Sequence, residues 1–136
     1  QLSKLYGMEQ PCVEKMKAST RNAVFKVLGQ ERDFVLKLFK VSGNYNRTRV
    51  AEHTAYEMAL VDALCERGVP TAAVISTAGG ELPFVEGHPA LLFERIPGSV
   101  QQKPEYPLGS IGAALAQIHQ VQIDCSLGVE GHFTFD

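Results

Sequence analysis

The chain has 136 residues, 45% hydrophobic and 21% charged, with 13 basic and 15 acidic side chains and a net charge of −2. This composition is that of an ordinary globular domain and disfavours a disordered or fibrous protein. Balanced charge without a basic run disfavours nucleic-acid and membrane-surface partners, and no stretch reaches the roughly 18 apolar residues of a membrane span.

Three strands are predicted near the N-terminus, at residues 12–18, 23–28 and 34–40. These segments carry the β-branched and aromatic residues that favour strands. The short polar stretch 29–33 contains a glycine, which predicts a hairpin between the second and third strands. Polar residues 42–46 then end the sheet pattern.

A helix is predicted over residues 48–67, where the hydrophobic period changes from that of a strand to that of a helix. Gly68 and Pro70 follow this segment and end the helix. Its apolar residues share one stripe, which we expect to face the sheet (Val50, Leu60, Val61, Leu64).

The second half of the chain predicts two more strands, 72–77 and 90–96, which are expected to pair. Pro97 and Gly98 break the second of these strands, and residues 99–107 form a polar linker. A short amphipathic helix follows at 110–121, with four apolar residues on one face (Ile111, Ala114, Leu115, Ile118). The expected fold is α+β, with a five-stranded antiparallel sheet, one long helix packed on it, and one further helix.

Lys37 is the most informative residue, because strand alternation places it on the same face as Val35 and Phe39. An ammonium group among apolar neighbours is costly to bury unless it meets an anion, either a carboxylate or a bound phosphate. The alternative is that Lys37 lies near a sheet edge and extends its charged end into water. The residue pattern alone leaves both explanations open.

Glu57 has the complementary property, because Leu60, Val61 and Leu64 share its helical face. A carboxylate therefore lies on the stripe expected to face the sheet, although a boundary position with its tip in solvent is the alternative. An inward lysine on the third strand and an inward glutamate on the following helix can neutralise each other. We expect Lys37 and Glu57 to approach within about 4 Å.

The segments FVLKLFK, ERGVPTAAVIST, LLFERIPG and IGAALAQIHQV occur in this order, with Glu57 thirteen residues before Pro70. This set resembles the N-terminal lobe and following helix of aminoglycoside phosphotransferases, homoserine kinases and choline kinases, over residues 12–121. The resemblance implies a protein-kinase-like N-terminal lobe at 1–96 and a hinge and linker at 97–109. It also implies that residues 110–136 form the first helix leading to a C-terminal lobe outside this chain.

By this resemblance, Lys37 is the lysine that holds the α- and β-phosphates of ATP, and Glu57 is the glutamate that orients it. The segment LLFERIPG matches the hinge between lobes, where the carbonyl of Glu94 and the N–H of Ile96 would meet adenine, with Phe93 nearby. The sequence alone favours a buried strand that ends at a Pro-Gly turn.

Ser19, Thr20 and Asn22 match the family's phosphate-binding loop between the first two strands. The glycines that usually precede the asparagine are missing from this chain. Backbone N–H groups and the two hydroxyls can still bind an anion, but close approach of a phosphate is less favoured without glycine.

The histidines and cysteines predict neither a metal site nor a disulfide framework. No ligand spacing links the four histidines, and the three cysteines have no C-x-x-C pair. His53 lies one turn before Glu57 on the same helical stripe. His119 is near a helix end, and His88 and His132 lie in predicted loops. The cysteine usage, and an N-terminus without signal-peptide features, favour a cytoplasmic protein.

A kinase of this family needs a catalytic Asp in an HxDxxxxN-like loop and a second Asp that binds Mg²⁺. Neither motif occurs in these 136 residues. We therefore expect an inactive chain, the ATP-binding N-terminal part of a phosphotransferase. In the full-length enzyme, the C-terminal lobe would bind Mg²⁺ and the small-molecule acceptor.

Two other functions remain open at this point. One is a naturally short kinase-like module that binds a nucleotide or a partner without catalysis. The other is an unrelated α+β interaction domain in which Lys37 and Glu57 are coincidental. The acceptor, whether an aminoglycoside, homoserine or a choline-like alcohol, is not predicted. An uncovered apolar face on the helix at 110–121 also predicts a homodimer.

Overall fold

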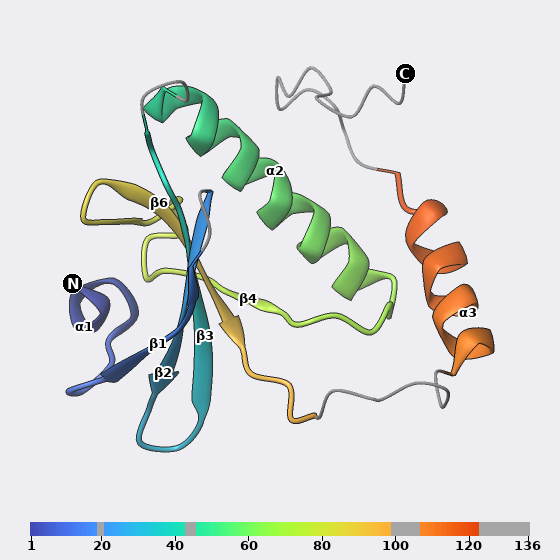
Figure 1. The fold of residues 1–136 in the computed structure, drawn as a ribbon, viewed down its shortest axis with the longest axis horizontal. Helices are drawn as coiled ribbons and strands as arrows, with labels where there is room; N and C mark the ends of the chain where they lie inside the picture. Colours follow the sequence, from blue (N-terminus) through green and yellow to red (C-terminus); the bar gives the residue numbers. More distant parts are fainter. Residues whose placement is uncertain (19–20, 43–45, 99–106, 123–136) are drawn as a thin grey trace.

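The computed structural model describes residues 1–18, 21–42, 46–98 and 107–122. Within these ranges the chain forms helices α1 (Leu2–Tyr6), α2 (Arg47–Glu66) and α3 (Leu108–His119), and strands β1 (Cys12–Ala18), β2 (Asn22–Leu28), β3 (Asp33–Phe39), β4 (Val74–Ile75), β5 (Phe84–Val85) and β6 (His88–Glu94). The strands form an antiparallel sheet in the order β1-β2-β3-β6-β4, with β5 paired to β6 (Figure 1).

One face of the sheet forms the main hydrophobic core and is covered by α1. Cross-strand partners such as Leu36 and Leu92 share this face, because directly paired residues point to the same side of a sheet. Leu2 of α1 is 6% exposed and belongs to the same cluster. The other buried members come from the three central strands (Ala23, Val27, Phe34, Leu38, Ala90).

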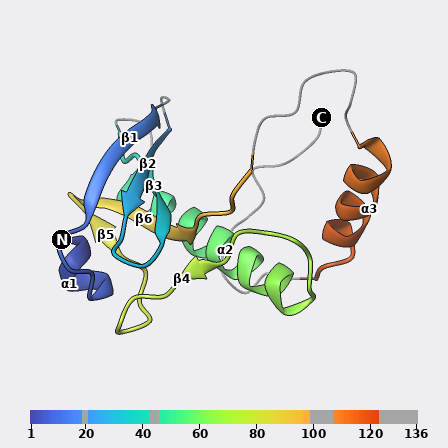
Figure 2. The same ribbon diagram turned by 90° about the horizontal axis from the view of Figure 1, so that it is seen from below.

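The opposite face of the sheet is covered by α2, so the sheet lies between α1 and α2 (Figures 1 and 2). Val61 and Leu64 of α2 are buried, as is Leu91 of β6. Lys37 is the partner of Leu91 across the β3–β6 pair and therefore lies on this α2 face. Strand β6 is buried on both sides, which makes it the centre of the fold.

Two glycines have conformations or surroundings that a side chain would disturb. The N–H of Gly29 donates to the carbonyl of Arg32 across the β2–β3 turn at 3.2 Å, and a Cβ at position 29 would lie 2.5 Å from that oxygen. Gly68 has a φ of 71° directly after α2, and its N–H donates to the carbonyl of Cys65. This left-handed residue ends the helix as the sequence predicts.

The predicted α+β fold and its antiparallel sheet are confirmed, with several corrections. The sheet gains the two-residue strand β5, and α1 covers the face that we expected to be bare of helices. Strand β4 spans 74–75 rather than 72–77, β6 spans 88–94 rather than 90–96, and α3 begins at Leu108 inside the predicted linker. Among the described residues, neither α2 nor α3 combines the length and apolarity of a membrane-spanning helix.

Strand β4 is short because regular pairing with β6 stops on each side of it. Before it, Ala73 still accepts a hydrogen bond from the backbone N–H of Glu94, but its own N–H donates to the Glu94 carboxylate instead of a backbone carbonyl. After it, the Thr77 hydroxyl donates to the carbonyl of Glu81, and the N–H of Gly80 donates to the carbonyl of Thr77. Residues 76–83 therefore form a closed turn instead of a longer strand.

Candidate functional site

Lys37 and Glu57 meet between the sheet and α2. The Nζ of Lys37 donates to Oε1 of Glu57 at 2.7 Å, and the two side chains keep 25% and 33% of their surface exposed. Strand alternation on β3 and the helical stripe of α2 bring them together, which confirms the predicted ion pair. Both side chains are engaged with each other and also remain partly exposed to solvent.

Several direct neighbours of Lys37 are apolar. Its Nζ lies 4.6 Å from the centre of the Phe39 ring, and Val24 and Leu91 are its cross-strand neighbours on β2 and β6. A charged group in such a position needs a compensating anion. Because both side chains are partly exposed, the pair stabilises the fold by no more than about 1 kcal/mol.

The ion pair lies in a pocket of about 570 Å³ between α2 and the adjoining ends of β2 and β3. Asn22, one of the predicted phosphate-loop residues, lines this pocket together with Lys37 and Glu57. Eight further residues line the pocket, of which Arg21, Arg49 and Tyr56 were not singled out from the sequence (Arg21, Phe39, Arg49, Val50, His53, Tyr56, Leu60, Val61). The α2 members of this set recur every three or four residues, which places them on one face of the helix.

The lining of the pocket suits an anion. Arg21, Lys37 and Arg49 are cationic and Glu57 is the one carboxylate among its lining residues, so its formal charge is +2 with His53 neutral. The chain as a whole carries −2, so the pocket is positive against the overall charge. Guanidinium, ammonium and amide donors are the groups that bind phosphate oxygens in proteins. Within the described ranges, no cluster of three or more His, Cys, Asp or Glu side chains could hold a metal ion.

The predicted hinge residues lie at the end of β6. Phe93 is half-buried and pairs with Val35 of β3, two residues before Lys37 and on the same face. Glu94 is held on both its backbone and its side chain by Ala73, and Ile96 is 58% exposed. Ser19 and Thr20 lie outside the described residues.

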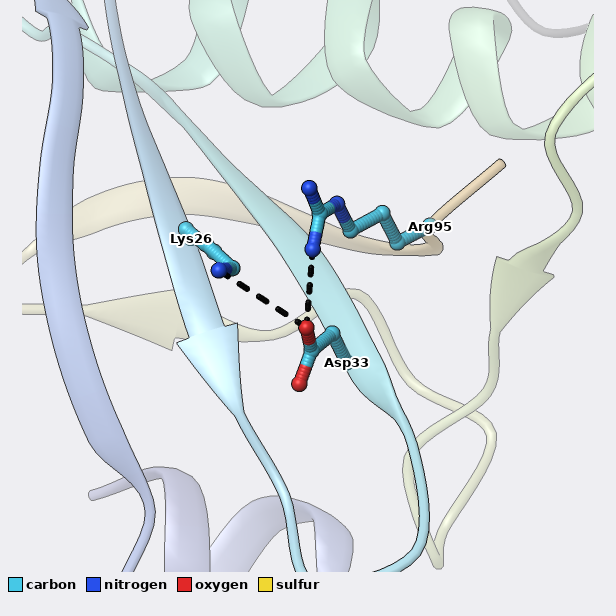
Figure 3. A network of polar contacts seen from close by, with 3 residues as sticks. All are labelled: Lys26, Asp33 and Arg95. Carbon is cyan, nitrogen blue, oxygen red and sulfur yellow. Dashed lines mark hydrogen bonds and ion pairs between the residues drawn. The ribbon is translucent and has the colours of Figure 1, made fainter. Parts of the chain in front are cut away.

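A second polar cluster joins the hinge to β3. Figure 3 shows Lys26 and Arg95 directed at the carboxylate of Asp33, with Arg95 NH1 at 2.8 Å and Lys26 Nζ at 3.8 Å from Oδ2. Asp33 and Lys37 lie on the same face of β3, so this cluster and the Lys37 pair occupy opposite ends of one strand face. Arg95, just after β6, is thus connected to the strand that carries Lys37.

The histidines occupy different places from one another. His53 lines the pocket, as its position one turn before Glu57 allowed. His88 is the first residue of β6 and not a loop residue, and its Nδ1 accepts a hydrogen bond from the N–H of Val41 at 3.0 Å. His119 is the last residue of α3, and His132 lies outside the described residues.

The pocket residues missed by the sequence analysis differ in whether a local sequence pattern could have revealed them. Arg49 precedes Glu57 by eight residues, so a helical stripe through His53 and Glu57 would have included it. Arg21 reaches the pocket only because β2 pairs with β3 so that Asn22 opposes Phe39. That pairing register depends on the whole hairpin.

Comparisons with known proteins agree with this geometry. The model of a family described as "Phosphotransferase enzyme family" matches residues 13–135. No curated protein matches the sequence. Among solved structures, a spectinomycin phosphotransferase in complex with ADP and spectinomycin is similar with a TM-score of 0.68 and 16% identity over 93% of this chain.

A second similar structure is a putative aminoglycoside phosphotransferase from Ralstonia eutropha JMP134, with a TM-score of 0.51 and 19% identity over 77% of this chain. At these identities the likeness concerns the fold. The chain spans 37% and 28% of the lengths of these two proteins, respectively.

Proposed function

Because this chain belongs to the phosphotransferase enzyme family, we propose that its Lys37 pocket binds the phosphates of ATP. The chain would then be the N-terminal, nucleotide-binding part of an enzyme that transfers a phosphoryl group to a hydroxyl of a small molecule. In this proposal residues 1–96 form the nucleotide-binding lobe, 97–109 the hinge and linker, and 110–136 the start of the connection to a C-terminal lobe.

The observation that carries the proposal is the 2.7 Å contact between Lys37 and Glu57 inside a pocket lined by cations. Phosphoryl transfer depends on positioning the phosphates and on neutralising their charge. Lys37 supplies a positive charge at a fixed point on a rigid strand. Glu57 holds the lysine side chain in that position, so the ammonium group needs little reorganisation when a phosphate arrives.

The nucleobase would lie toward the hinge. Phe93 and Val35 form a cross-strand pair on the face that carries Lys37, and both lie between Lys37 and the end of β6. The backbone of Glu94 and Ile96 would offer a carbonyl and an N–H to the adenine edge. Asn22, Ser19 and Thr20 would donate hydrogen bonds to the phosphates at the opposite end.

The remaining chemistry would come from residues outside this chain. The sequence contains neither the HxDxxxxN-like loop with the family's catalytic Asp nor the motif with its Mg²⁺-binding Asp. The donors that line the pocket do not suit Mg²⁺, so we assign this ion to the C-terminal lobe. The acceptor would also be selected there, and the resemblance of the sequence leaves aminoglycosides, homoserine and choline-like alcohols as candidates.

Calorimetric titration of the chain with ADP tests the nucleotide site. We expect the wild-type chain to bind ADP, and Lys37→Met to weaken binding by about tenfold or more, since a charge-assisted hydrogen bond to a phosphate is lost. Lys4→Met, which removes a lysine from α1 on the other side of the sheet, is the matched control and should bind as the wild type does. Equal affinity in the two variants would contradict the proposal.

A further inference from the structure

The pocket is lined by other cations besides Lys37. Arg21, which directly precedes β2, and Arg49, in the first turn of α2, line the same cavity. Arg49 precedes Glu57 by eight residues, which is about 12 Å along the helix axis. The Lys37–Glu57 ion pair and the Arg49 side chain therefore line different parts of the pocket.

Arg21 and Arg49 lie at the same end of the pocket. Asn22 pairs with Phe39 at the end of β3, and the N–H of Lys40 donates to the carbonyl of Arg21 at 2.8 Å, so the start of β2 lies beside the end of β3. Helix α2 begins a few residues later, at Arg47. The chain direction thus brings the start of β2, the end of β3 and the start of α2 together. His53 lies on α2 between this end and Glu57.

The apolar walls of the pocket strengthen the attraction between these cations and an anion. Phe39, Val50 and Leu60 line the cavity beside the cations. Apolar walls lower the local dielectric constant, so an anion inside feels the cations more strongly than it would at an open surface. Two arginines also suit phosphate better than lysines would, because the guanidinium group can form two parallel hydrogen bonds.

We propose that Arg21 and Arg49 form a second anion subsite that binds the outer phosphates of a polyphosphate whose inner phosphates contact Lys37. This inference rests on the proposed function for the identity of the ligand. With this subsite, cationic side chains of this chain itself would neutralise several phosphate charges. It would also favour a polyphosphate over a monophosphate at this pocket.

Arg47 provides a matched comparison within the same helical turn. Its guanidinium carbon lies 4.5 Å from the centre of the Phe84 ring, and it is not among the pocket residues. Arg47→Gln and Arg49→Gln remove the same charge from the same end of α2. Only the second change removes it from the pocket. Arg21→Gln tests the subsite from a different element, should either helix variant fold poorly.

The test is calorimetric titration with inorganic tripolyphosphate, without Mg²⁺, at low and at high salt. We expect the wild-type chain to bind tripolyphosphate at low salt and to lose affinity at high salt. Arg49→Gln and Arg21→Gln should each bind about three- to tenfold more weakly, and Arg47→Gln should bind as the wild type does. AMP binding should be unchanged in all three variants, since AMP has no outer phosphates.

The results of these titrations test the arginine subsite independently of the proposed nucleotide site. Equal tripolyphosphate affinity in Arg47→Gln and Arg49→Gln, with Arg21→Gln also unchanged, would overturn the subsite even if Lys37→Met loses ADP binding. Failure of the wild type to bind tripolyphosphate would overturn it as well. Tripolyphosphate binding that depends on the two arginines, with ADP bound no more tightly than tripolyphosphate, would support the subsite and contradict the nucleotide function.

Discussion

At the scale of single residues, the Lys37–Glu57 ion pair contributes little to stability. Their side chains are 25% and 33% exposed, and partly exposed ion pairs contribute at most about 1 kcal/mol. The cavity beside them is lined by two further cations, Arg21 and Arg49. A lysine held by one carboxylate and facing such a cavity is arranged to share its charge with an incoming anion.

Tyr6 gives the clearest pH dependence among the described residues. Burial raises its pKa from 10.0 to about 12, and its hydroxyl is buried. The unfolded chain therefore loses this proton near pH 10, before the folded chain does. The resulting stability is complete below pH 10 and is lost as the pH rises toward 12.

We predict that Tyr6→Phe removes this loss. Between pH 8 and pH 11, the free energy of unfolding of the wild type should fall by about 1 kcal/mol more than that of Tyr6→Phe, an effect limited because the ring is only partly buried. Urea unfolding of both proteins at the two pH values measures the difference. An identical fall in both proteins would show that Tyr6 ionises as freely in the folded chain as in the unfolded one.

At the scale of elements, α2 depends on its first turn. The Asn46 side chain accepts a hydrogen bond from the N–H of Arg49 at 2.8 Å and caps the helix. The side chain of Arg49 is also part of the proposed anion subsite. The cap therefore fixes the backbone of a residue that the site uses.

Asn46→Ala should lower the free energy of unfolding by about 1 kcal/mol, because a helix N-cap side chain is lost. Asn46→Asp keeps an oxygen acceptor at the same position and should be close to the wild type. Chemical denaturation of the three proteins distinguishes the two changes. If alanine and aspartate at position 46 gave the same stability, the cap would not be a significant interaction.

The long elements could be predicted from the sequence, and the short ones could not. Strands β1 to β3 and helix α2 carry enough residues for a period of two or 3.6 to be recognised, and Gly68 ends α2 as expected. Helix α1 has five residues and β5 has two, which is too short for any period. They are stabilised by contacts with distant residues, as when the N–H of Ala78 donates to the carbonyl of Leu5.

The same contrast applies to the site. Lys37 and Glu57 were predictable because each breaks the apolar pattern of its own element on the buried side. Arg21 joins the pocket through the register of the β2–β3 pair, which no local pattern determines. Ser19 and Thr20 lie outside the described residues, so their part in the site stays a prediction.

At the scale of the whole molecule, the chain has the fold of one lobe, and the match covers 37% of the similar spectinomycin phosphotransferase. Helix α3 carries an exposed apolar face, with Leu108 73% and Leu115 50% exposed. Exposed apolar surface of this kind is commonly buried by association. The predicted homodimer through this face stays a prediction, which sedimentation of the chain at micromolar concentration would measure.

The central claim is that the pocket at Lys37 is the nucleotide-phosphate site of a phosphotransferase lobe. A crystal structure of the chain grown with ADP tests it most directly. We predict a phosphate oxygen within about 3 Å of Lys37 Nζ, with the base beside Phe93 and the hinge backbone. ADP bound at another surface, with the Lys37–Glu57 pair unchanged and the pocket without phosphate, would contradict the account.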